Sequence, residues 1–113
     1  MEKTIRILPE ADNFLLDLPF ILINEGYKSS FENALALVDD IIVFIRNLNN
    51  VPHYVVPKEF AYHFSRYGNN LSYAFFNRKS SRKTTWYVFF QSTANQILVT
   101  HISNNWIEGC YIR

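Results

Sequence analysis

The sequence predicts an α+β fold in which a helical hairpin packs on a small, mainly antiparallel and twisted sheet, in the order β-α-α-β-β-β. Two observations predict this class. Between residues 9 and 48, apolar residues recur at spacings of three and four, which is the period of an amphipathic helix. Residues 71–106 then hold three aromatic-rich apolar runs separated by two polar turns, a pattern typical of an antiparallel meander.

The length and composition indicate one globular domain over residues 1–113. Hydrophobic residues make up 49% of the chain and charged residues 19%, which excludes a disordered protein. Cys110 is the only cysteine, so no intramolecular disulfide forms and a reducing, cytoplasmic location is expected. The N-terminus lacks the apolar region of a signal peptide, and no apolar run approaches the roughly 18 residues of a membrane span. No contact with a membrane is therefore expected.

The first elements are predicted to be a short strand and a helix. Residues 3–8 alternate in the manner of a strand, and Pro9 suits the first turn of the helix that follows. Pro19 interrupts the helical pattern and predicts a kink or a restart, and Gly26 is expected to end the segment. The apolar stripe of this helix consists of Phe14, Leu15, Leu18, Ile21 and Leu22.

A second, longer helix is the most regular pattern in the chain. Ser29 and Glu32 have the spacing of a capping box at its start. Its stripe consists of Phe31, Ala34, Leu35, Val38, Ile41, Ile42, Ile45 and Leu48. Residues 58–67 are expected to form a further short helix, which residues 68–70 terminate.

The meander is predicted to have strands at residues 71–77, 84–91 and 96–103. The second of these is apolar on both faces, and in the third Ile97 and Val99 are expected to lie opposite Leu98 and Ile102. A sheet covered by helices on one face only should alternate apolar and polar residues. The second face is therefore expected to be covered, either by the connector at residues 51–67 or by another chain.

The charges divide unevenly along the chain. Residues 1–57 hold eight acidic and four basic residues, whereas residues 58–113 hold two acidic and seven basic residues. Such an asymmetry indicates an anionic partner for the second half, or simply a segregation of signs over the surface. The candidate nucleic-acid-binding residues are the basic hairpin and an aromatic neighbour suited to stacking on bases, namely Arg78, Lys79, Arg82, Lys83 and Trp86.

The order of elements resembles that of the RelE/ParE superfamily of bacterial toxins. Two stretches carry the resemblance, TIRILPEADNFLLDLP and TTWYVFFQSTANQILVTHISNN. The first is similar to the opening strand and first helix of the family, and the second to its last two strands. The resemblance runs over nearly the whole chain.

Membership of this superfamily implies the toxin of a type II toxin–antitoxin module, with a cognate antitoxin protein as its partner. One branch of the family cleaves messenger RNA in the ribosomal A site, and another inhibits DNA gyrase without hydrolysis. In the first branch the 2′-OH of the RNA attacks the adjacent phosphate, which requires no metal and no cofactor. The sequence itself shows no cluster of metal-ligating residues at a suitable spacing.

The resemblance also implies candidate catalytic residues. Arg82 or Lys83 falls near the basic position of the family at the start of the third strand, and Tyr111 matches its C-terminal tyrosine. Asn105 stands where the family usually has an arginine. Since histidine titrates near neutrality, His101 is a candidate for proton transfer, its alternative role being that of a solvent-facing strand residue.

Three hypotheses follow from these patterns. The leading one is a ribosome-dependent mRNA endonuclease of RelE type that acts through the catalytic candidates above. The second is a gyrase inhibitor of ParE type, which Asn105 in place of arginine favours. The third is an inactive toxin-fold module that binds a partner chain across its aromatic sheet face.

Overall fold

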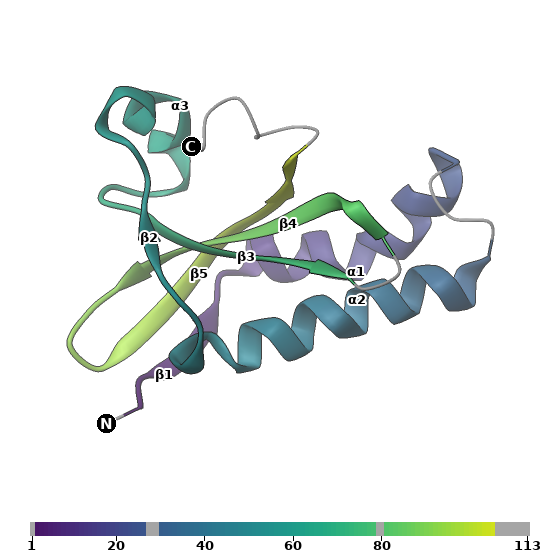
Figure 1. Ribbon diagram of the computed structural model, residues 1–113, viewed down its shortest axis with the longest axis horizontal. Coiled ribbons are helices and arrows are strands. Elements are labelled where there is room, and N and C mark those ends of the chain that lie inside the picture. Colours follow the sequence, from purple (N-terminus) through teal and green to yellow (C-terminus); the bar gives the residue numbers. More distant parts are fainter. Residues whose placement is uncertain (1, 27–29, 79–80, 106–113) are drawn as a thin grey trace.

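The computed structural model describes residues 2–26, 30–78 and 81–105, and for residues 81–83 it describes the backbone only. Within these residues the fold is α+β, with three α-helices and a five-stranded, mostly antiparallel sheet (Figure 1). The elements are β1 (Thr4–Ile7), α1 (Pro9–Asn24), α2 (Phe31–Arg46), η1 (Leu48–Asn50), β2 (Tyr54–Val55), η2 (Lys58–Phe60), α3 (Ala61–Phe64), η3 (Ser65–Tyr67), β3 (Ser72–Arg78), β4 (Ser81–Ser92) and β5 (Gln96–Asn104).

The strands are ordered β1-β5-β4-β3-β2 across the sheet. The predicted meander is confirmed, because β3, β4 and β5 pair antiparallel with one another. β1 pairs parallel with β5, from Thr4 beside Gln96 to Ile7 beside Val99. The sequence pattern gave no position for β1 in the sheet, and it did not predict the two-residue edge strand β2, which pairs with β3.

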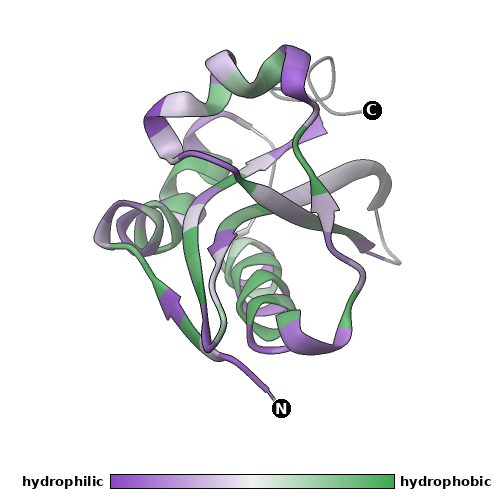
Figure 2. Cartoon of the chain, turned by 90° about the vertical axis from the view of Figure 1, so that its left-hand side faces the viewer, coloured by the Kyte–Doolittle hydropathy of each residue, from purple (hydrophilic) through white to green (hydrophobic). Residues whose placement is uncertain are grey.

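Helix α1 begins at Pro9 as predicted, and it continues through Pro19 without a restart. Its buried residues are Ala11, Leu15, Leu18, Pro19 and Leu22, and Figure 2 shows apolar and polar residues alternating around the helices. Gly26 follows the helix with a φ of 76°, a left-handed conformation that glycine adopts without steric strain. The prediction that Gly26 ends the segment is confirmed.

The start of α2 corrects the predicted capping box. The N-cap is Ser30 rather than Ser29, and its Oγ accepts a hydrogen bond from the backbone N–H of Asn33 at 3.2 Å. Glu32 therefore stands one position too early in the helix to complete a capping box with the N-cap residue. The sequence offers two adjacent serines, so the spacing to Glu32 alone selected the wrong one.

Replacing Ser30 with alanine is expected to lower the free energy of unfolding by about 1 kcal/mol, because the N–H of Asn33 loses its acceptor. Chemical denaturation monitored by circular dichroism measures this loss. Ser29→Ala is the matched comparison, and we expect it to change stability much less. A larger loss for Ser29→Ala than for Ser30→Ala would contradict the observed cap.

The sheet carries a hydrophobic core on each face. On one face, α1 and α2 pack against Trp86, Val88, Phe90, Ile97 and other apolar residues of the sheet. On the other face, the segment at residues 56–67 covers Tyr73, Tyr87 and Phe89, and Figure 1 shows α3 on the side of the sheet away from α1 and α2. The second face is thus covered locally, by the connector, for these three residues.

The register of β5 contains a bulge that the alternation rule did not anticipate. Phe89 pairs with His101 whereas Phe90 pairs with Val99, so Thr100 is the extra residue. Beyond the bulge the alternation is reversed, and Ile102 joins Ile97 and Val99 in the core beneath the helices. The prediction that Ile102 lies opposite Ile97 and Val99 is therefore wrong.

Among the described residues, no helix is both long enough and apolar enough to cross a membrane.

Candidate functional site

A row of aromatic rings crosses the sheet on the face away from α1 and α2. Tyr54 of β2 pairs with Tyr73 of β3, Tyr73 pairs with Phe89 of β4, and Phe89 pairs with His101 of β5. Rings of adjacent members lie 5.4 to 5.9 Å apart between centroids. Directly opposed side chains in neighbouring strands are close enough for such contacts. The row therefore links the β2 edge of the sheet to His101.

The bulge at Thr100 places His101 in this row. Without the extra residue, His101 would share a face with Ile97 and Val99 and point into the helical layer. With it, the imidazole lies on the opposite face, half-buried beside Phe89. Bulges redirect side chains in this way, and they are frequent next to functional sites.

The imidazole of His101 forms one layer of a stack with two residues of η3. The Tyr67 ring lies over it at a centroid distance of 3.7 Å and an interplanar angle of 7°. The guanidinium carbon of Arg66 lies 5.0 Å from the centroid of the Tyr67 ring, within the range of a cation–π contact. The Tyr67 ring thus lies between a permanent cation from its own segment and an imidazole from β5.

Gly68 positions η3 for this stack. Its φ of 135° and ψ of 166° belong to a region that essentially only glycine adopts. A Cβ added at Gly68 would lie 2.7 Å from the side-chain nitrogen of Gln91. The Gln91 atom is the end of a flexible side chain that can move, so the positive φ is what favours glycine at the turn from η3 toward β3.

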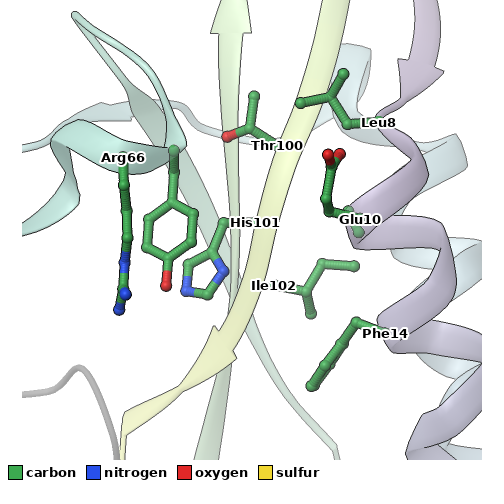
Figure 3. Close-up of a pocket in the computed structure, with 9 residues that line it drawn as sticks. Leu8, Glu10, Phe14, Arg66, Thr100, His101 and Ile102 are labelled. Carbon is green, nitrogen blue, oxygen red and sulfur yellow. The ribbon is translucent and has the colours of Figure 1, made fainter.

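An open cleft of about 390 Å³ lies beside the stack, at the point where β1 leaves the edge of β5 and the chain enters α1. Arg66, Tyr67 and His101 contribute to one part of its lining, and the start of α1 contributes Glu10 and Phe14. Figure 3 shows Arg66 and Glu10 on opposite sides of His101. The cleft therefore combines a cation, an imidazole and a carboxylate, which are the groups that proton transfer at a phosphate requires.

The predicted basic hairpin does not reach this cleft. Lys83 is six residues from Phe89 along β4, and Phe89 is the partner of His101; at about 3.3 Å per residue this separation is roughly 20 Å. Arg82 is one residue further away. The backbone of Arg82 and Lys83 therefore lies far from His101 along β4, and their role in holding a phosphate stays a prediction.

The structure describes the remaining predicted site residues only in part. Arg78 ends β3, and its Nε donates to Oδ2 of Asp40 at 2.6 Å, so this guanidinium ties the sheet to α2. Lys79 and Tyr111 lie outside the described residues, and so do the side chains of Arg82 and Lys83.

Trp86 does not present its ring to solvent. Its side chain is only 4% exposed and belongs to the core under α1 and α2. The prediction that Trp86 stacks on nucleic-acid bases is therefore wrong. Tyr73 and Phe75 lie on the other face of the sheet, in the neighbouring strand β3; Tyr73 is buried and Phe75 is exposed.

Asn105, which stands in place of the expected arginine, has a structural contact. Its Oδ1 accepts a hydrogen bond from the backbone N–H of Thr85 at 2.8 Å. The side chain therefore fastens the end of β5 to β4.

The phenol of Tyr73 remains neutral at physiological pH. Burial raises its pKa above the ordinary value, and the neighbouring phenols of Tyr87 and Tyr54 add to the effect. The centre of the aromatic row thus carries no charge.

Sequence patterns missed Arg66, Tyr67 and Glu10 as members of the site. Residues 58–67 were expected to form a short helical segment, but no local signal connects this segment to His101. The only sequence hint is Arg66-Tyr67 directly before Gly68, where a helix must end at a special turn.

Within the described residues, no group of three or more His, Cys, Asp or Glu side chains is arranged to hold a metal ion. In comparisons of this chain with protein-family models, with curated proteins and with solved structures, no match was found.

Proposed function

We propose that this protein is a toxin of RelE type, which cleaves messenger RNA on the ribosome without a metal ion and is silenced by a cognate antitoxin. The observation that carries the proposal is the placement of His101 and Arg66 on the two sides of the Tyr67 ring, beside an open cleft. The strand, helical hairpin and meander in this order support it as well.

The cleft supplies the groups for attack of a ribose 2′-OH on the adjacent phosphorus. In this step a new P–O bond forms to the 2′ oxygen while the bond to the 5′ oxygen breaks, leaving a 2′,3′-cyclic phosphate. Glu10 accepts the proton of the 2′-OH, and His101 in its protonated form donates a proton to the departing 5′ oxygen. Arg66 stabilises the charge that develops on the phosphoryl oxygens.

Controlled expression in bacteria tests this function. We expect growth arrest, with cuts near codons in ribosome-bound transcripts, and we expect co-expression of the small open reading frame beside the gene to relieve the arrest. Arg66→Ala should reduce cutting at least tenfold, because the phosphate loses its cation. Lys58→Ala is the matched control, since Lys58 is an exposed base of the same segment that does not line the cleft.

Growth arrest with intact transcripts would refute the nuclease. That outcome would favour the second candidate, inhibition of DNA gyrase, which is supported by the structural contact of Asn105 where an arginine was expected. Purified gyrase would then lose supercoiling activity in the presence of the protein, and RNA would stay uncut. No growth arrest and no cutting would leave a module that only binds a partner.

A further inference from the structure

The outer side of β1 is an open edge of the sheet. Within the described residues β1 pairs with β5 alone, and the backbone N–H groups of Thr4 and Leu8 donate to carbonyl oxygens on that side at 3.0 and 2.9 Å. Since alternate residues of a strand direct their backbone groups to opposite edges, Ile5 and Ile7 direct theirs away from β5. These two residues therefore offer main-chain donors and acceptors to a further strand.

The side chain of Asn49 shows what this edge accepts. The backbone N–H of Lys3 donates to Oδ1 of Asn49 at 2.9 Å, and Nδ2 of Asn49 donates to the carbonyl oxygen of Lys3 at 2.9 Å. One amide group thus bonds both backbone groups of Lys3, as a residue of a neighbouring antiparallel strand would. In the part of the chain that the structure describes, no side chain does the same for Ile5 or Ile7.

An open groove of about 600 Å³ lies beside this edge, between β1 and the two long helices. β1 contributes Ile5 and Ile7 to its lining, α1 contributes Leu16, and α2 contributes Ile42. The side chain of Leu16 is 66% exposed, so this apolar lining is open to solvent. Figure 1 shows β1 at the margin of the sheet, near the end of α2, where a ligand can approach both the edge and the groove.

The charges of the groove do not favour a nucleic acid or an anionic lipid. Its lining holds two acidic residues, Glu2 and Asp12, and two basic residues, Lys3 and Arg46. The ammonium group of Lys3 already donates to Oγ of Ser92 at 2.6 Å. Main-chain hydrogen bonds and apolar contact therefore select the ligand of this groove, rather than a net charge.

An extended polypeptide meets both of these requirements. A helix uses its N–H and C=O groups internally, so a helical ligand would leave the edge of β1 unpaired. An extended chain pairs with an exposed edge through its main chain, and its alternate side chains enter the pockets beside that edge.

We propose that β1 and the groove bind an extended segment of a partner protein with apolar residues at alternate positions. The segment pairs with Ile5 and Ile7 as an additional strand of the sheet, and its apolar side chains enter the groove. This inference is independent of the nuclease, because the groove and the cleft of His101 share no lining residue.

The test uses a labelled synthetic peptide of about eight residues, roughly 26 Å long when extended, in which valine alternates with threonine and lysine. Fluorescence anisotropy measures its affinity for the purified protein, and NMR measures amide hydrogen exchange of the protein with and without the peptide. In the complex we expect exchange at Ile5 and Ile7 to slow at least tenfold, because both N–H groups gain acceptors. Thr4 and Arg6 are internal references, since their N–H groups face β5 in both states.

Two methylated versions of the peptide separate strand pairing from other kinds of binding. One version carries N-methyl groups on its valines, and the other carries them on the residues between the valines. Because only alternate amides of a strand face its neighbour, one version should lose at least tenfold in affinity while the other binds like the unmethylated peptide. Equal affinities of the two methylated versions would overturn the inference.

A substitution in the groove tests the apolar contact. Leu16→Ser should weaken binding of the unmethylated peptide at least fivefold, because an apolar side chain of the lining is lost. Val43→Ser is the matched control, since Val43 is a 54% exposed aliphatic residue of α2 that does not line the groove, and it should bind like the wild type. Thermal unfolding verifies that both variants are folded.

Three further outcomes would overturn the inference. The first is no binding of the unmethylated peptide at millimolar concentration, and the second is unchanged exchange at Ile5 and Ile7 in the saturated complex. The third is a dimer of the free protein, seen by light scattering, in which these two amides are already protected. That result would identify a second copy of this chain, rather than a partner protein, as the occupant.

Discussion

Replacing His101 with phenylalanine is expected to reduce RNA cleavage at least 100-fold and to leave the fold intact. A positioned general acid or base contributes about 100- to 10,000-fold to a rate. Phenylalanine keeps a flat ring in contact with Tyr67 and Phe89, whose ring centroids lie 3.7 and 5.4 Å from that of His101. It removes only the two nitrogens that can carry a proton.

The measurement compares initial cleavage rates on ribosome-bound transcripts, together with thermal unfolding of each variant. His63→Phe is the matched control, because His63 packs against Phe64 in α3 and does not line the cleft. Its cleavage rate should equal that of the wild type.

A result in which His101→Phe cleaves RNA at the wild-type rate would exclude proton transfer by His101. Glu10→Gln tests the opposite step of the same reaction, the acceptance of the 2′-OH proton. Glu10 is an exposed residue in the first turn of α1, so its loss should affect the rate far more than stability. If neither variant changes the rate, the cleft is not the active centre.

The sequence predicted most of the layers of this fold because they depend on local periodicity. The apolar stripe of α2 and the three runs of the meander each repeat often enough to specify an element. β1 was also predicted, since residues 3–8 alternate. Its pairing with β5 was not, because the choice of neighbour is decided by the packing of the whole chain rather than by the strand itself.

The site was harder to predict because it depends on three local exceptions. The bulge at Thr100 inverts the faces of the residues that follow it, and no residue type in that run indicates a bulge. Trp86 looked suited to base stacking, but its position in β4 directs it into the core. Arg66 and Tyr67 join His101 only because Gly68 turns the chain back over the sheet.

Phe89 lies at the centre of this arrangement, and Phe89→Ala is expected to lower the free energy of unfolding by about 3–5 kcal/mol. The side chain is fully buried. Its ring stacks on Phe64 at 4.8 Å and contacts Tyr73 and His101 at 5.9 and 5.4 Å. Truncation leaves a cavity beneath the covering segment and removes contacts between aromatic rings, each of which contributes about 0.5–1.5 kcal/mol beyond burial.

Urea denaturation measures this loss. Tyr62→Ala is the control, because Tyr62 is an exposed aromatic residue, and this variant should change the free energy of unfolding by less than about 0.5 kcal/mol. Phe89→Leu fills part of the cavity and should recover part of the stability. Because the Phe89 ring stacks against His101, Phe89→Leu should also lower cleavage while His101 is still present. Cleavage at the wild-type rate by a folded Phe89→Leu protein would show that Tyr67 alone positions the imidazole. A loss of stability below about 1 kcal/mol for Phe89→Ala would contradict the central packing role of Phe89, since truncating a fully buried phenylalanine costs more than that.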